Sequence, residues 1–433
     1  MKRVFFTACL FASMGLGVQS CKDSLEVLPT DSVDESTAIN NATSANAAVT
    51  GLYSELQDED LVIDGFLVMP QMFSDEMDHT GTFPTRAEFG RLAVFPENST
   101  MAAAFSDFYD VVNVANNLIE RLPMVDDAAY TEADMNSHLA EARFVRAYCY
   151  FILTNYWGDV PLVLAATKAD DLGESLQVPN TPQADIYTQI LSDLSFAEAN
   201  IGGNANTRAT AASVAALKAR THLYLGNWEE AQAAAEASLA AATSEDIWYL
   251  QFTSVDNNSN AFYYYPGALG GRRIVAPSAA LINAFEAGDA RFAASIDTTT
   301  VPGQPFGTKY TDIANGTDPI YFFRAAEMKL IVAEAAAEQG DFATASQYIN
   351  MVRSDAGLGD ITLDATNFED AILQERFVEL AMEGAHRLLD LRRRGKAFEV
   401  LSGIGYEEGC DDLWPLPQRD LDRNPNLTQN PCY

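Results

Sequence analysis

One segment of the chain, residues 139–163, reads LAEARFVRAYCYFILTNYWGDVPLV. Between residues 144 and 153 only Arg146 is charged, so a helix formed here is apolar on almost every face and belongs in the protein interior. Gly158 then favours a turn out of the helix, and Pro161 prevents the helix from restarting. The pattern therefore predicts a buried helix that ends in a fixed turn.

Small and apolar residues recur at helical spacing in several other segments, including residues 37–56, 102–122 and 183–200. Two later helix pairs share a connecting motif, which is GNWEEA at 226–231 and GDFATA at 340–345. In both motifs Gly, an aromatic residue and Ala stand at the same offsets. This is typical of the turn in a tetratricopeptide helix pair, where small residues let two helices approach closely. We therefore predict an all-α protein built from tetratricopeptide-like repeats.

Two segments interrupt the helical pattern, at residues 58–100 and 244–320, and both combine aromatic rings with charged or amide side chains among Gly and Pro. Flat rings beside such groups suit sugars, whose C–H faces stack on a ring while their hydroxyls form hydrogen bonds. The alternative is that the rings pack these loops onto the helices. The candidate stacking residues in the second segment are Trp248, Tyr263, Tyr265 and Tyr310.

The chain is strongly acidic, with 61 Asp and Glu against 27 Lys and Arg and a formal net charge of -34. Such a charge repels nucleic acid, so we do not expect nucleic acid to be a partner. No metalloprotease, nucleophile-elbow, phosphate-loop or Cys-x-x-Cys motif is present, so we expect no catalytic residue, no metal site and no cofactor. Neighbouring carboxylates such as Asp75 and Glu76 arise by chance in so acidic a chain and do not by themselves indicate a glycosidase.

The first twenty residues have the pattern of a secretory signal, with Lys2 and Arg3 before an apolar run and a small-residue cleavage site before Cys21. A cysteine after a small residue resembles a bacterial lipobox, so we predict that Cys21 carries lipid. The alternative is ordinary secretion with Cys21 incidental. No later segment approaches eighteen consecutive apolar residues, so the chain is expected to be lipid-anchored rather than membrane-spanning.

Three further cysteines remain in the exported chain, at Cys149, Cys410 and Cys432. Cys149 falls in the predicted buried helix. Cys410 and Cys432 can form a bridge over the Pro-rich tail in an oxidising compartment, or remain two free thiols.

Residues 368–400 carry a cationic run in which arginines alternate with acids at steps of three and four. Local ion pairs along one helix explain this run better than a ligand does. The tail after it is rich in Pro and Asn, and we expect it to be extended.

Taken together, several motifs resemble the SusD/RagB family of surface-exposed, outer-membrane, glycan-binding lipoproteins. They are the lipobox-like Ser20 and Cys21, the EARFVRAYCYFILTNYWGDVPLV stretch, LKARTHLYLGNWEEA, FFRAAEMKLIVAEAAAEQGD, QERFVELAMEGAHRLLDLRRRG and the closing LWPLPQRDLDRNPNLTQNPCY. The resemblance implies about four tetratricopeptide-like helix pairs with a loop-rich ligand-binding part. It also implies a partner, a SusC-like TonB-dependent transporter to which oligosaccharide is delivered. The tail departs from the family pattern by ending Pro-Cys-Tyr instead of Pro-Gly-Tyr, which suits the Cys410–Cys432 bridge.

On this resemblance the run Ser74, Asp75 and Glu76 is similar to the family's acidic loop, which makes Asp75 a candidate ligand residue with Arg86 or Arg91 nearby. We expect a signal peptide over 1–20, a tether over 21–36 and a single domain over 37–433. That domain should hold helical repeats within 37–56, 102–242 and 320–356, loop-rich inserts at 58–100 and 244–320, and C-terminal helices with an extended tail over 357–433. The runner-up function is a tetratricopeptide scaffold that binds protein or peptide, and a surface glycosidase is a distant third.

Overall fold

The structure, a computed structural model, describes residues 38–167 and 177–433. The predicted signal peptide over 1–20, the lipidation site at Cys21 and the tether over 21–36 lie outside the described residues. Helices dominate the described chain, and its strands form only two-stranded ribbons, so the all-α prediction is confirmed. No helix in the described ranges is long and apolar enough to cross a membrane.

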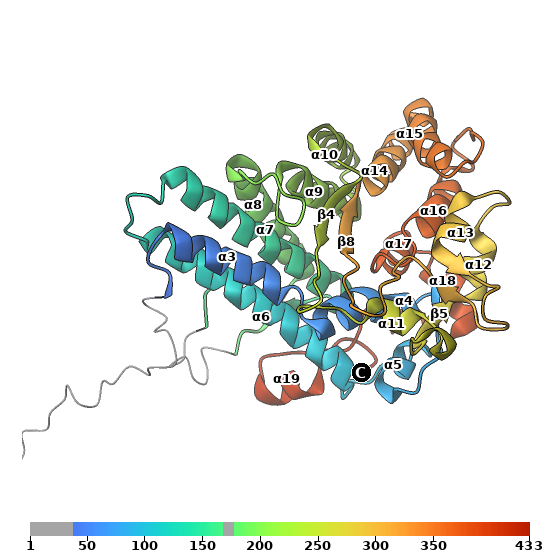
Figure 1. Cartoon of the computed structure of the whole chain (residues 1–433), viewed down its shortest axis with the longest axis horizontal. Coiled ribbons are helices and arrows are strands. Elements are labelled where there is room, and N and C mark those ends of the chain that lie inside the picture. Colours follow the sequence, from blue (N-terminus) through green and yellow to red (C-terminus); the bar gives the residue numbers. More distant parts are fainter. Residues whose placement is uncertain (1–37, 168–176) are drawn as a thin grey trace, which may run out of the picture.

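Eight helices form the repeat part of the molecule and follow one another from the left of Figure 1 across its top. They are α3 (Ala42–Glu55), α6 (Ser99–Arg121), α7 (Glu132–Trp157), α8 (Gln183–Asn200), α9 (Ala211–Leu225), α10 (Trp228–Ala241), α14 (Ala325–Glu338) and α15 (Phe342–Asp355). Within this series, each helix from α7 onward packs on the one named after it. Helix α10 packs directly on α14, although a long segment separates them in the sequence. The predicted pairs α9–α10 and α14–α15 are therefore neighbours in one stack.

The remaining elements form the second part, most of which lies toward the bottom and right of Figure 1, with β4 and β8 near the centre. Those before β4 are η2 (Asp60–Val68), α4 (Met69–Met72), β1 (Met77–His79), α5 (Pro84–Phe89), η3 (Leu122–Met124), β2 (Val160–Pro161) and β3 (Asn180–Thr181). Those from β4 to β8 are β4 (Asp246–Leu250), α11 (Asn260–Tyr264), η5 (Gly267–Leu269), β5 (Val275–Pro277), α12 (Ala279–Ala284), α13 (Ala290–Ser295), β6 (Ile296–Asp297), β7 (Phe306–Gly307) and β8 (Ile320–Arg324). The C-terminal ones are α16 (Phe368–Glu379), α17 (His386–Arg393), α18 (Ala397–Leu401), η6 (Ser402–Ile404) and α19 (Gln418–Arg423).

Helix α7 is the buried helix that the sequence predicts. Seventeen of its side chains are buried, among them every residue from Phe144 to Leu153. The buried charge of Arg146 is neutralised inside the protein, because its guanidinium donates to both carboxylate oxygens of Asp193 at 2.9 and 2.7 Å. Trp157 at its end is fully buried, with its ring edge-on to Phe105, so this residue belongs to the scaffold.

Two sequence expectations for this part of the fold were wrong. Residues 60–72 are not a loop but the π-helix η2 followed by α4, and every residue from Leu61 to Ser74 is buried. Periodicity missed this segment because side chains buried all round show no polar face. The C-terminal tail, which we expected to be extended, includes the short helix α19 between segments without regular secondary structure.

The tetratricopeptide-like turns depend on glycine. Gly226 ends α9 with φ +69°, a left-handed conformation that costs an L-residue about 1–2 kcal/mol. We therefore expect Gly226→Ala to lower the free energy of unfolding by that amount in urea titrations. Gly51 is the matched control, because it lies inside α3 with open space where a substituted side chain would place its Cβ. Gly51→Ala should instead raise stability by about 0.5–1 kcal/mol, and a shift of the same sign in both variants would contradict the explanation.

Candidate ligand-binding site

The two irregular segments meet through a short antiparallel ribbon. Strand β1 pairs with β5, with Asp78 opposite Ala276 and His79 opposite Val275. Beyond the ribbon, the Ile274 carbonyl accepts hydrogen bonds from the amides of Thr80 and Gly81 at 2.8 and 3.1 Å. Helix α5 contacts β1 and α11 contacts β5, so the ribbon brings the two helices together near the lower right of Figure 1.

Arg86 on α5 is the centre of this region. Its guanidinium donates twice to the Asp64 carboxylate of η2, with both N–O distances 2.6 Å. The residue is only 8% exposed, and the two-point ion pair fixes the plane of the guanidinium. Arg86 is therefore held by the scaffold, and its remaining contacts are with aromatic rings.

Two half-buried rings from the two irregular segments contact Arg86. The guanidinium carbon lies 4.7 Å from the Phe83 ring centroid and 5.0 Å from that of Tyr263. The Tyr263 hydroxyl donates to Glu59 at 3.3 Å, and the exposed Arg272 lies 4.2 Å from the Phe83 ring centroid. We call these five residues, Glu59, Phe83, Arg86, Tyr263 and Arg272, the α5–α11 surface.

The α5–α11 surface combines the groups that carbohydrate recognition uses. Partly exposed rings offer a face for sugar C–H groups, and exposed carboxylate and guanidinium groups can accept from and donate to hydroxyls. The sequence named Arg86 and Tyr263 as candidates, and the structure brings them together. It also adds Glu59, Phe83 and Arg272, which the sequence did not single out.

Asp75 lies elsewhere, which corrects the expectation that it sits beside Arg86 or Arg91. Its carboxylate accepts two hydrogen bonds from Arg387 of α17, both 2.7 Å, and the two side chains are each 12% exposed. Arg387 also packs on the Phe377 ring. The ion pair joins the segment after α4 to α17. Both carboxylate oxygens of Asp75 therefore make a structural contact and are not free to bind a ligand.

Trp248 and Tyr310 do not fit the prediction that they stack on a sugar. Trp248 is 0% exposed, and its ring is stacked on Phe322 with centroids 4.5 Å apart. Tyr310 is 1% exposed and donates its hydroxyl to the Met382 carbonyl at 2.9 Å. Both rings pack the irregular segment onto the core, which is the alternative that the sequence left open.

Tyr265 and Arg91 stay predictions. Tyr265 is half-buried against Phe306, with ring centroids 4.9 Å apart. Arg91 is exposed and forms no ion pair within the described ranges. Burial, followed by the charges of Arg91 and Arg86, lowers the pKa of His79 in β1, so Arg91 lies near the β1–β5 ribbon.

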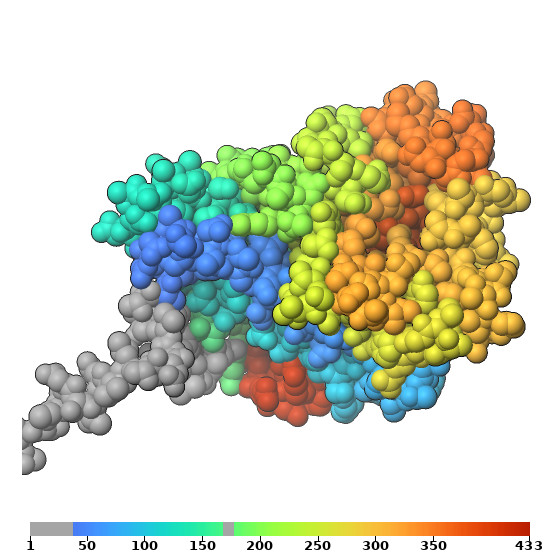
Figure 2. Space-filling view, viewed as in Figure 1, coloured from blue at the N-terminus to red at the C-terminus, as the bar shows by residue number. Residues whose placement is uncertain are grey.

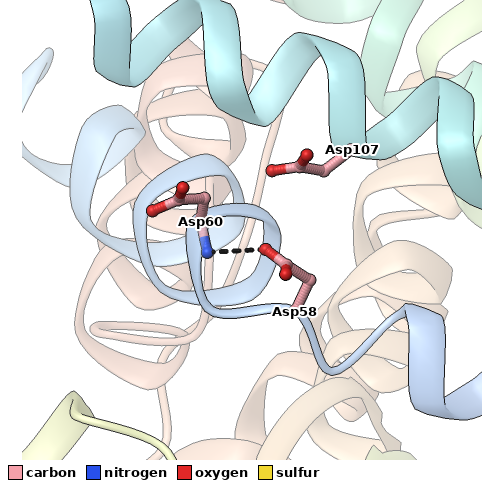
Figure 3. Close-up of side chains that lie close together, drawn as sticks. All are labelled: Asp58, Asp60 and Asp107. Carbon is pink, nitrogen blue, oxygen red and sulfur yellow. Dashed lines mark hydrogen bonds between the residues drawn. The ribbon is translucent and has the colours of Figure 1, made fainter.

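A cluster of three carboxylates lies at the start of η2. The oxygens of Asp58, Asp60 and Asp107 all lie within 4.8 Å of one another, and Asp58 accepts the Asp60 amide at 2.9 Å (Figure 3). Burial, followed by the charges of Asp58, Asp60 and Asp110, raises the pKa of Asp107 to about 7. Three oxygen ligands are chemically suited to a hard cation such as Ca²⁺. One carboxylate oxygen of Asp107 is buried without a hydrogen-bond partner among the described residues, but Asp58 and Asp60 are exposed, and exposed acidic groups are common without an ion.

Cys410 and Cys432 form a disulfide in the structure, with their Cα atoms 5.4 Å apart. The bridge closes the C-terminal segment near the exposed Arg91, and both cysteines line a hollow with residues 91–96. Cys149 is free and buried.

The structure is a stack of helix pairs, and its irregular segments carry a surface of aromatic rings and arginine side chains. These two features define the class of helical-repeat binding proteins. Two family models match this chain: the model described as "SusD family" over residues 307–433, and "Starch-binding associating with outer membrane" over residues 24–225. The two models together span residues 24–225 and 307–433, and they assign the chain to the SusD/RagB family.

Relatives and solved structures agree with this assignment. SusD-like protein P2 of Formosa agariphila is 25% identical, with 98% of this chain and 99% of the relative covered. A laminarin-binding SusD-like protein has a TM-score of 0.79 at 24% identity, with 91% of this chain and 100% of that chain covered. A SusD superfamily protein from Bacteroides vulgatus has a TM-score of 0.80 at 22% identity, covering 92% and 99%. These structural likenesses show that the fold is shared.

Proposed function

We propose that this protein is a non-catalytic binding lipoprotein that holds oligo- or polysaccharide on the α5–α11 surface. The observation that supports this most is the position of Arg86, fixed by Asp64 and in contact with one half-buried ring from each irregular segment. The fixed guanidinium keeps both rings in place before a ligand arrives, which lowers the entropy cost of binding.

In the same proposal the chain is anchored through Cys21 in the outer membrane, faces the outside, and delivers its glycan to a SusC-like TonB-dependent transporter. The family model named for association with the outer membrane and the SusD-like relatives support this part. Co-purification of a large outer-membrane protein with the tagged full-length chain from its native cells is the expected result. Recovery of the chain alone under mild detergent would contradict the delivery step.

A glycan array probed with the purified full-length protein tests the ligand class. Glucans come first, because the names of a matching family model and a structural neighbour mention starch and laminarin. We expect binding to at least one glycan class and no release of reducing ends after long incubation. Reducing-end release would indicate a glycosidase, and binding to peptides but to no glycan would favour the tetratricopeptide scaffold.

The double variant Phe83→Ala/Tyr263→Ala tests the site. Loss of aromatic anchors from a binding surface typically costs ~2 kcal/mol or more, so we expect affinity for the glycan found on the array to fall at least about thirtyfold by isothermal titration. Trp228→Ala is the matched control, because Trp228 is a half-buried aromatic residue on α10, at the opposite edge of the molecule in Figure 1. Equal affinities in the double variant and the wild type would exclude the α5–α11 surface as the site.

A further inference from the structure

A second hollow lies apart from the α5–α11 surface, between β8, α13 and the turn after α16. Its volume is about 290 Å³ and it shares no lining residue with that surface. Figure 2 shows the molecule hollowed beside the yellow α12–α13 segment, with the red C-terminal helices at the floor. The side chains that determine its chemistry are Asp246, Lys309, Tyr321, Arg324, Glu379 and Glu383.

One wall of the hollow is the outer face of the β4–β8 ribbon. In this antiparallel pair Asp246 stands opposite Arg324, and Tyr249 stands opposite Tyr321. The inward side chain of Trp248 is fully buried, whereas Tyr249 and Tyr321 are both half-buried with ring centroids 6.2 Å apart. The outer face therefore presents partly open rings next to an oppositely charged pair.

The charges that line the hollow cancel. With Arg291, three cationic side chains face three carboxylates, in a chain whose formal net charge is -34. The cations already have partners, since Arg324 donates to Glu383 and Glu379 at 2.8 Å each. The Lys309 ammonium pairs with Glu383 and donates to the Ala381 carbonyl. An anionic ligand would have to displace these carboxylates, and a cation would meet no excess of negative charge.

Two polar groups of the hollow remain open. The Asp246 carboxylate and the Tyr321 hydroxyl form no hydrogen bond with any residue that the structure describes. A carboxylate accepts from hydroxyls, a phenol both donates and accepts, and the Tyr321 ring offers a flat apolar face. These groups fit a ligand that is neutral, rich in hydroxyls and apolar on one face.

We propose that this hollow is a second carbohydrate site, sized for one sugar residue or for the end of a longer chain. Its volume lies at the lower limit of pockets that hold small molecules, which excludes a long oligosaccharide from lying wholly inside it. The inference rests on the proposed function, because it takes sugar to be what the protein binds. Tyr321 is the stacking residue and Asp246 is the hydroxyl acceptor.

Fluorine NMR of the full-length protein with 3-fluorotyrosine at its 17 tyrosines tests both sites in one spectrum. Tyr263→Phe and Tyr321→Phe each remove one signal and so assign it. The probes are glucose, laminarin oligosaccharides and starch oligosaccharides. We expect the Tyr321 signal to shift when sugar is added. In the Phe83→Ala variant the Tyr321 signal should still shift, with a dependence on sugar concentration that is separate from that of the Tyr263 signal.

The outcomes separate the two proposals. A shift of Tyr263 alone would overturn the second site and leave the α5–α11 surface intact, whereas a shift of Tyr321 alone would do the reverse. No shift of either signal with any probe would overturn both. Asp246→Asn should weaken the response at Tyr321 about tenfold and leave that at Tyr263 unchanged, because one hydrogen bond to a charged group is lost. An unchanged Tyr321 response would show that this ring senses sugar bound elsewhere.

Discussion

Replacing Asp193 with alanine is expected to lower the free energy of unfolding by about 3–5 kcal/mol, because it leaves a buried guanidinium without its counter-charge. Asp193 is 0% exposed and Arg146 is 4% exposed, and the pair joins α7 to α8 at the centre of the stack. The Asn116 side-chain oxygen accepts one further Arg146 N–H at 2.7 Å, but it carries no negative charge to replace the carboxylate.

Urea unfolding measures this effect, and a second ion pair on α8 supplies the control. Lys218 and Glu198 also join α8 to the next helix, but Glu198 is 54% exposed, so Glu198→Ala should cost no more than about 1 kcal/mol. The double variant Arg146→Met/Asp193→Leu should recover most of the stability, because it removes both charges together. Equal losses in Asp193→Ala and Glu198→Ala would contradict a buried charge at the centre of the stack.

Glu76 should make the protein less stable as the pH rises from about 4.5 to about 8. Burial, opposed by the Met382 amide and reinforced by Asp75, raises the pKa of Glu76 from 4.5 to about 8. Between these values the folded protein holds a proton that the unfolded chain has released, so stability falls with pH. Each pKa unit corresponds to about 1.4 kcal/mol, so the full effect is on the order of 5 kcal/mol above pH 8.

Glu76→Gln isolates this contribution. Glutamine keeps the side-chain oxygen that accepts the Met382 amide at 2.7 Å, but it does not titrate. Because Asp107 titrates in the same direction, the informative quantity is the difference between the wild-type and variant stability curves. We expect the variant to gain on the wild type steadily from pH 5 to pH 8. A constant difference over that range would show that Glu76 is ionised throughout.

The helical part of the fold was predictable because its determinants are local. GNWEEA and GDFATA each place a glycine where the chain must adopt positive φ, and the structure has Gly226 at +69° and Gly340 at +81°. The helical segment at residues 61–72 was missed for the opposite reason, because its residues are all buried and carry no period.

The C-terminal arginines show where local reasoning fails. The sequence predicted ion pairs along one helix, and Arg393 does pair with Asp390 three residues away. Arg393 also pairs with Glu334 of α14, and Arg394 pairs with Glu338 of the same helix. These contacts join distant segments, and spacing within one helix cannot reveal them.

The candidate site was predictable only in part. Arg86 and Tyr263 were named for their chemistry, but only the β1–β5 register shows that they touch. Trp248 and Tyr310 have the same chemistry and are buried, because an aromatic side chain in a short strand or loop suits a core and a ligand surface equally well. Phe83 gave one usable signal, since Pro84 directly after it marks the start of a helix that holds Arg86.

Hydrogen–deuterium exchange of the full-length protein with and without its glycan tests the central claim most directly. If the α5–α11 surface holds the ligand, backbone amides within residues 79–91 and 260–274 should exchange more slowly when sugar is bound, and those of α10 should not change. Protection confined to the helix stack, with none in these two segments, would contradict the account.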